Sequence, residues 1–194
     1  MDRFWLYLRL GFEHISDLAG YDHILFLVAL CAVYRLSQWR NILILVTAFT
    51  VGHSVTLAIA SLGSVPIPAR VVEFLIATTI VATAAHNVVG RGGVEAGATM
   101  WPSYLMALFF GFIHGLGFSN YFRALLMNQD AIALPLFSFN VGVELGQLLV
   151  VAVIVAVAAL VTRVFGARQR DWNLVVSGAA GGIGLTLMQQ SWPF

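Results

Sequence analysis

Long runs of apolar residues, broken by short polar or glycine-containing connections, dominate this chain. A helix needs about 20 residues to cross the ~30 Å hydrocarbon core of a membrane. Six segments approach or exceed this length, at residues 20–36, 41–62, 67–89, 102–126, 134–162 and 172–191. The pattern predicts an all-α fold, a polytopic transmembrane helix bundle of six to seven helices. We expect it to form a single transmembrane domain over residues 1–194, without a soluble part.

Residues 1–19 are amphipathic and leave two arrangements open. Asp2, Arg9, Glu13 and Ser16 share one narrow stripe of a helix, and apolar residues occupy the rest of its surface. This helix either lies in the outer membrane interface or forms a short additional membrane helix that packs its polar stripe inward. A cleaved signal peptide is not expected, because Arg9 and Glu13 interrupt the apolar region.

The arginines predict an orientation. Most of them fall in alternate connections, at Arg35, Arg40, Arg91, Arg163, Arg168 and Arg170. Under the positive-inside rule these connections are cytoplasmic, so the first long segment begins outside and the C-terminus lies in the periplasm. Arg70 and Arg123 lie near the other side and count against this orientation. We expect a multi-pass protein of the bacterial inner membrane.

Composition supports a membrane protein and excludes other classes. Hydrophobic residues make up 60% of the chain and charged residues 10%, with a mean hydropathy of +0.89. A soluble domain carries about 25% charged residues. The net charge of +1 and the lack of a long basic cluster argue against nucleic acid as a partner. The expected surroundings are the lipid bilayer.

Histidines and carboxylates inside the apolar segments are the main candidates for chemistry. A charged group in a bilayer costs about 2.5–3.5 kcal/mol and therefore tends to mark a path or a site. Helical rise places His53 and His114 about 18 Å from the cytoplasmic ends of their segments and Glu144 about 15 Å from an outer end. We therefore predict one shared metal site with the ligands Asp22, His23, His53, His114 and Glu144.

Further polar residues are predicted to support this site, namely His14, Ser54, Asn140 and Gln147. Asn140, Glu144 and Gln147 recur at helical spacing and form one polar stripe. Structural hydrogen bonding explains Asn140 and Gln147 as well as a functional role does. Asp22 and His23 point about 100° apart on a helix, so one of them is expected to bind the ion while the other supports it.

A short internal similarity is also present. The tetrapeptide GFEH at residues 11–14 recurs as GFIH at residues 111–114. Inverted repeats are common in transporters. No other segment aligns convincingly in the sequence, so chance is the simpler explanation for this similarity.

Five ordered motifs carry a family resemblance, namely GYDHILFL, TAFTVGHSVTLAIA, VVEFLIATTIV, FGFIHGLGF and FNVGVELGQ. Over about residues 11–150 the chain resembles the HupE/UreJ family of bacterial membrane proteins, in a divergent second branch. The resemblance implies a secondary permease linked to nickel or cobalt supply for hydrogenase and urease. Asp22 and His23 would be its Asp-His motif. Gly117-Phe118-Ser119 stands where nickel permeases carry a second histidine-rich motif ending in glutamate.

Three functions remain open from the residues. A divalent transition-metal permease is favoured, because imidazole suits nickel, cobalt and zinc. Its exit path is poorly marked, since the inner half offers only His86, Asn87 and hydroxyl groups. The alternative is an intramembrane zinc-dependent hydrolase of a lipid or membrane-embedded peptide, with Glu144 or Asp22 as general base. The third is a structural role based on buried polar bonds alone.

Overall fold

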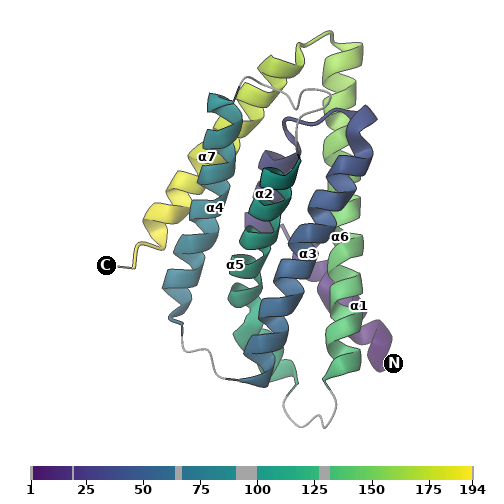
Figure 1. Ribbon diagram of the computed structural model, residues 1–194, viewed down its shortest axis with the longest axis vertical. Coiled ribbons are helices and arrows are strands. Elements are labelled where there is room, and N and C mark those ends of the chain that lie inside the picture. The colour runs from purple at the N-terminus through teal and green to yellow at the C-terminus, as the bar shows by residue number, and fades with distance from the viewer. Residues whose placement is uncertain (1, 19, 64–66, 91–99, 127–131, 194) are drawn as a thin grey trace.

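The computed structural model describes residues 2–18, 20–63, 67–90, 100–126 and 132–193 (Figure 1). These residues contain seven α-helices and no strand, which confirms the predicted all-α bundle. The helices are α1 (Arg3–Ser16), α2 (Asp22–Cys31), α3 (Trp39–Leu62), α4 (Ala69–Val89), α5 (Trp101–Leu125), α6 (Ala133–Ala159) and α7 (Gln169–Gln190). A 3₁₀ turn η1 (Leu36–Gln38) precedes α3, and a π-helical turn η2 (Leu160–Val164) follows α6.

Four helical segments are long and apolar enough to cross a membrane. They are Leu36–Leu62, Ala69–Val89, Trp101–Leu125 and Ala133–Val164. The predicted segment 20–36 is shorter as a helix, because α2 ends at Cys31 after 10 residues. The predicted segment 172–191 forms α7, which is not among these four.

The amphipathic N-terminal segment forms α1 and packs along α6. Its buried residues are Tyr7, Gly11 and Ile15. Arg9 Nε and Glu13 Oε1 form an ion pair of 2.7 Å, and both side chains are at least half exposed. Its polar stripe therefore faces out of the helix pair, and the packing face is the apolar one.

Close contacts through glycine hold α3 against α5. A Cβ atom on Gly52 would overlap the carbonyl of Leu108, and one on Gly111 would overlap the carbonyl of Phe49. Small residues allow such close packing, which is a main source of helix association in membranes. The α3·α5, α1·α6 and α4·α7 pairs form the most extensive helix contacts.

A polar network joins α4 and α7 to α2 in the buried interior. Asn87 Nδ2 donates to Ala29 O at 2.7 Å and to Ser177 Oγ at 3.1 Å. Ser177 Oγ donates to Asn173 Oδ1 at 2.9 Å, and Asn173 Nδ2 donates to Asn87 O at 3.0 Å. This network fixes α2, which is too short to cross the bundle alone, beside the two longer helices.

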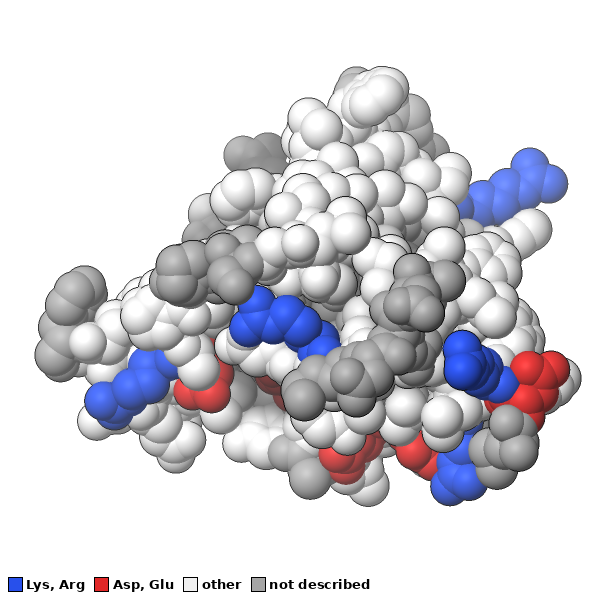
Figure 2. Space-filling model, turned by 90° about the horizontal axis from the view of Figure 1, so that it is seen from below, with Lys and Arg blue, Asp and Glu red and all other residues white. Residues whose placement is uncertain are grey.

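The two ends of the bundle differ in charge. At the upper end of Figure 1, where α3 and α7 begin, lie Arg35, Arg40, Arg163, Arg168 and Arg170. At the lower end, acidic and arginine side chains lie together (Figure 2). The upper end is the one predicted to be cytoplasmic, and this orientation stays a prediction. Arg91 lies outside the described residues.

Candidate metal centre

Four helices bring four histidines together in the middle of the bundle, and we call this group the histidine centre. His14 comes from α1, His23 from α2, His53 from α3 and His114 from α5. The His14–His23 ring centroids lie 4.7 Å apart, and the His23–His114 centroids 4.9 Å apart. His53 and His114 are completely buried, and His23 is 4% exposed. Three predicted ligands therefore meet, and His14, predicted as a supporting residue, lies among them.

The Asp22 carboxylate orients His23. Asp22 Oδ1 lies 3.1 Å from His23 Nδ1 and also accepts a hydrogen bond from the His23 backbone nitrogen at 2.8 Å. Since a carboxylate only accepts, His23 Nδ1 carries the hydrogen and Nε2 keeps its lone pair. His23 Nε2 is buried and has no hydrogen-bond partner among the described residues. Histidines that bind a metal through one ring nitrogen commonly donate the other ring N–H to a carboxylate in this way.

Thr79 of α4 orients His114 in the same way. The Thr79 hydroxyl donates to Ile76 O at 2.7 Å and lies 3.0 Å from His114 Nε2. With its hydrogen directed to Ile76, Thr79 accepts from His114 Nε2. His114 Nδ1 therefore keeps its lone pair, and it is buried without a partner within the described part of the chain.

The remaining two histidines also present nitrogens that lack partners. His14 Nε2 and both ring nitrogens of His53 are buried with no hydrogen bond to any described residue. An unpaired buried polar group costs about 1–3 kcal/mol. Ligand atoms of His14, His23 and His53 all lie within 4.8 Å of one another. Three converging imidazole nitrogens fit a divalent transition-metal ion.

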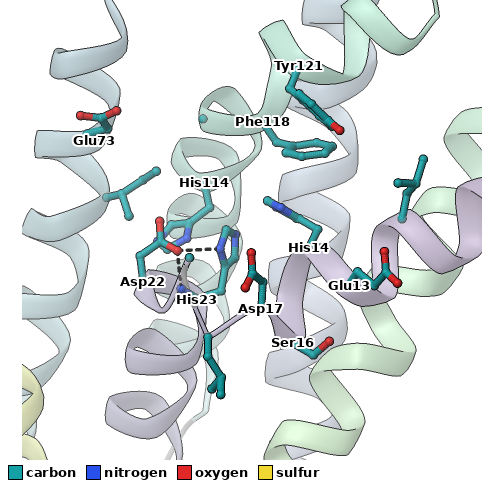
Figure 3. Close-up of a pocket in the computed structure, with 15 residues that line it drawn as sticks. Glu13, His14, Ser16, Asp17, Asp22, His23, Glu73, His114, Phe118 and Tyr121 are labelled. Atoms are coloured by element: carbon teal, nitrogen blue, oxygen red, sulfur yellow. Dashed lines mark hydrogen bonds and ion pairs between the residues drawn. The ribbon is translucent and has the colours of Figure 1, made fainter.

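A cavity of about 860 Å³ leads to this centre (Figure 3). Exposed Glu13, Asp17, Glu73 and Tyr121 line its rim, and His14, His23 and His114 line its deeper part. We call this space the outer cavity. It joins the centre to the lower end of the bundle, where the acidic side chains lie.

Glu144 lies in a different polar group. Its Oε1 accepts from Thr47 Oγ1 at 2.7 Å, and its Oε2 lies against the Thr50 hydroxyl. Thr50 Oγ1 also lies 2.7 Å from Gln147 Oε1. We call Thr47, Thr50, Glu144 and Gln147 the threonine–glutamate cluster. The predicted ligand Glu144 is therefore bound to hydroxyl groups of α3 in this structure.

The predicted supporting residues Ser54 and Asn140 differ in their hydrogen bonding. Ser54 Oγ donates to Thr50 O within its own helix, at 2.7 Å. Asn140 Nδ2 donates to Leu136 O at 2.8 Å, while its Oδ1 is buried without a partner among the described residues. Sequence reasoning missed Thr79, because nothing in an apolar helix distinguishes a threonine that orients a histidine from one that bonds its own backbone.

A comparison with protein-family models shows the family of this chain. The family model described as HupE / UreJ protein matches residues 1–194. The chain belongs to the HupE/UreJ family. This confirms the resemblance seen in the motifs and extends it to the whole chain. No curated protein and no solved structure matches the chain. Membership in HupE/UreJ, a family related to nickel and cobalt handling, together with the apolar helices, identifies a membrane protein related to metal handling.

Proposed function

We propose that this HupE/UreJ protein is a divalent transition-metal permease of the nickel or cobalt type. The observation that supports it is the placement of buried imidazole nitrogens without partners at the inner part of an open, acid-rimmed cavity. A transported ion needs a site that strips its water and a route by which it arrives. The histidine centre and the outer cavity supply these two parts.

The rim of the outer cavity attracts the cation first. Glu13, Asp17, Asp22 and Glu73 all line this cavity; Arg9 pairs with Glu13 from outside it, and no arginine among the described residues lines the cavity itself. A concave surface of one charge sign raises the local concentration of the opposite ion. The acidic rim therefore collects hydrated divalent cations at the lower end of the bundle.

The histidine centre then holds the ion. His14, His23 and His53 offer the nitrogens that lie closest together, and His114 adds a fourth next to His23. Asp22 acts through His23 by fixing the ring and raising the basicity of Nε2. Neutral imidazoles favour nickel, cobalt and zinc over magnesium and calcium, which prefer oxygen ligands. The cargo is therefore a transition-metal ion.

The threonine–glutamate cluster is assigned to the onward path. Thr50 lies three residues before His53 on α3, which is about 4.5 Å toward the upper end. Glu144 and the hydroxyl groups beside it thus offer oxygen ligands on the upper-end side of His53. Oxygen ligands bind such an ion more weakly than imidazole does, and weaker binding suits an ion that must leave again.

The positions of the carboxylates favour transport over hydrolysis. A zinc hydrolase needs a general base within hydrogen-bond reach of the metal-bound water. Asp22 is bonded to His23, and Glu144 is bonded to Thr47 and Thr50. Neither carboxylate is directed at the histidine nitrogens as a free base.

Uptake into proteoliposomes tests the proposal. We expect the purified protein to carry nickel, cobalt or zinc ions into vesicles, and His23→Ala to abolish this uptake. His86→Ala is the matched control, since His86 is an exposed histidine outside the centre. Stoichiometric metal binding without flux of any of the three ions would contradict a permease and favour a fixed metal site.

A further inference from the structure

Two pairs of helices in this protein are built from the same motif. In the α1·α6 pair, a Cβ on Gly11 would overlap the carbonyl of Phe139, and one on Gly142 would overlap the carbonyl of Leu8. In the α5·α3 pair, Gly111 meets the carbonyl of Phe49 in the same way, and Gly52 meets the carbonyl of Leu108. The contacts agree residue by residue.

The sequences around these contacts agree as well. GFEH of α1 corresponds to GFIH of α5, and FTVG at residues 49–52 of α3 corresponds to FNVG at residues 139–142 of α6. The tetrapeptide similarity, which sequence alone left to chance, therefore falls on equivalent structural positions. His14 and His114 are the equivalent histidines of the two motifs.

The two pairs run in opposite directions. Within each pair the helices are parallel, because Gly142 meets Leu8 and Gly146 meets Ile15, while Gly52 meets Leu108 and Gly115 meets Thr56. Helix α6 rises from the lower end, whereas α3 and α5 descend from the upper end (Figure 1). The rotation that superposes one pair on the other therefore has its axis across the bundle, and it exchanges the upper and lower ends.

The third extensive contact fits the same relation. If α1 corresponds to α5 and α3 to α6, then α4 corresponds to α7. Helices α4 and α7 run in opposite directions and pack against each other (Figure 1). The halves α1–α3–α4 and α5–α6–α7 thus form an inverted repeat, with α2 as an addition to the first half.

Aromatic side chains lie on both sides of the histidine centre. Phe26, Phe49 and Phe110 each lie three or four residues from a histidine of their own helix, toward the upper end. Phe26 packs on Phe49 and Phe110, with ring centroids 4.9 and 6.0 Å apart. We call these three residues the inner aromatic layer. All three are at least nine-tenths buried.

The opposite layer contains the repeat partner of Phe49. Phe139 packs on Phe118 and Phe122, with ring centroids 4.9 and 5.0 Å apart, and these three form the outer aromatic layer. His14 lies 5.8 Å from Phe139, as His114 lies 5.0 Å from Phe49. The outer cavity reaches His14 past Phe118, whereas Phe26 and Phe49 are closed over His114.

We propose that the inverted repeat exposes the histidine centre alternately to the two ends, with the inner aromatic layer as the closed gate of the outward-open state. This inference rests on the permease function proposed above. Transporters with inverted repeats work by movement of one repeat against the other around a central site. The repeat predicts that exchanging the conformations of the two halves closes the outer cavity and opens the inner aromatic layer.

Two equivalent variants test this exchange. In a Cys31→Ala background, Ser16→Cys reports on the outer cavity, and Ala107→Cys reports on a completely buried position one turn beyond Phe110. The experiment measures how fast a membrane-impermeant maleimide labels each of these two cysteines in vesicles that expose either the lower or the upper end of the protein. Phe49→Ala and Phe139→Ala remove equivalent buried rings from opposite layers. The minor state of a two-state protein has a population of about 0.1–10%, which leaves room for a tenfold shift.

Opposite effects of the two variants are expected. Phe49→Ala should accelerate labelling of Ala107→Cys from the upper end about tenfold and slow that of Ser16→Cys, and Phe139→Ala should do the reverse. Equal acceleration of both reporters in both variants would mean simple loosening and would overturn the proposal, as would no change in either. Phe49→Leu and Phe139→Leu keep most of the packing and serve if an alanine variant fails to fold.

A binding measurement separates the two proposals. Neither phenylalanine supplies a ligand atom, so both variants should retain nickel binding in titration calorimetry. A wild-type protein that binds no nickel, cobalt or zinc would remove the permease proposal. The labelling exchange would still decide whether the two halves move as an inverted repeat.

Discussion

Two buried polar groups in this protein, the histidine centre and the Asn87 network, have opposite hydrogen-bonding states. In the network, the side-chain amides of Asn87 and Asn173 and the Ser177 hydroxyl donate to one another or to backbone oxygens. In the centre, ring nitrogens of four histidines remain without partners among the described residues. Both groups lie in apolar surroundings, yet only one of them is complete without a ligand.

The difference separates structural polar residues from ligand-binding ones. Satisfied polar side chains join membrane helices by hydrogen bonds. Unsatisfied ones cost stability and persist where something else compensates, such as a metal ion. Residue type alone does not make this distinction, because Asn140 combines one satisfied and one unsatisfied group.

Removing a histidine should have the largest effect on metal binding. His53→Ala should weaken nickel affinity more than ~100-fold, because loss of a ligand exceeds the ~10–100-fold effect of losing a residue that supports one. Titration calorimetry of the detergent-purified protein measures this. The exposed His86→Ala variant should bind as the wild type does. Equal affinities in both variants would remove His53 from the site.

Removing the carboxylate that orients His23 should have a smaller effect. Asp22→Ala should lower metal affinity by about 10–100-fold, since His23 loses the group that fixes its tautomer. Asp22→Asn should lose less, because an amide oxygen still accepts from Nδ1. If the two variants lose the same affinity, Asp22 contributes its charge or binds the ion itself.

Neutralising the rim of the outer cavity should change rate more than affinity. Glu73→Gln should slow uptake by up to about fivefold at low ionic strength, because an exposed charge contributes about 0.2–1 kcal/mol and is screened by salt. Asp2→Asn, which neutralises a lower-end acid that does not line the cavity, should leave the rate unchanged. A Glu73→Gln effect that persists in high salt would indicate direct coordination instead.

Breaking the Asn87 network should leave metal affinity unchanged and lower stability. Asn87→Ala removes the amide donor that the buried Ala29 carbonyl and Ser177 hydroxyl accept from, and should cost about 1–3 kcal/mol. Asn140→Ala, whose amide nitrogen donates to the backbone of its own helix, should cost less. Reversible unfolding in detergent measures both. A loss of metal affinity in Asn87→Ala would show that the two polar groups are energetically coupled.

The sequence by itself determined the class of the protein and most of its elements. Apolar runs of helical length must form helices in a membrane, because every backbone polar group needs an internal partner there. Hence segments 41–62, 67–89, 102–126 and 134–162 match α3, α4, α5 and α6 closely. The motifs also identified the HupE/UreJ family, as the family model confirms.

The tertiary structure decided which polar residues meet. His14 joined the centre because glycine contacts draw α1 against α6, and Glu144 bonded Thr47 and Thr50 because α3 and α6 pack face to face at that level. Which side chains meet depends on how the helices pack against one another, whereas the sequence gives only the position of a residue along its own helix. The inverted repeat was hidden for the same reason: only the short matches GFEH with GFIH and FTVG with FNVG carry it in the sequence, and their equivalent contacts become visible only in the structure.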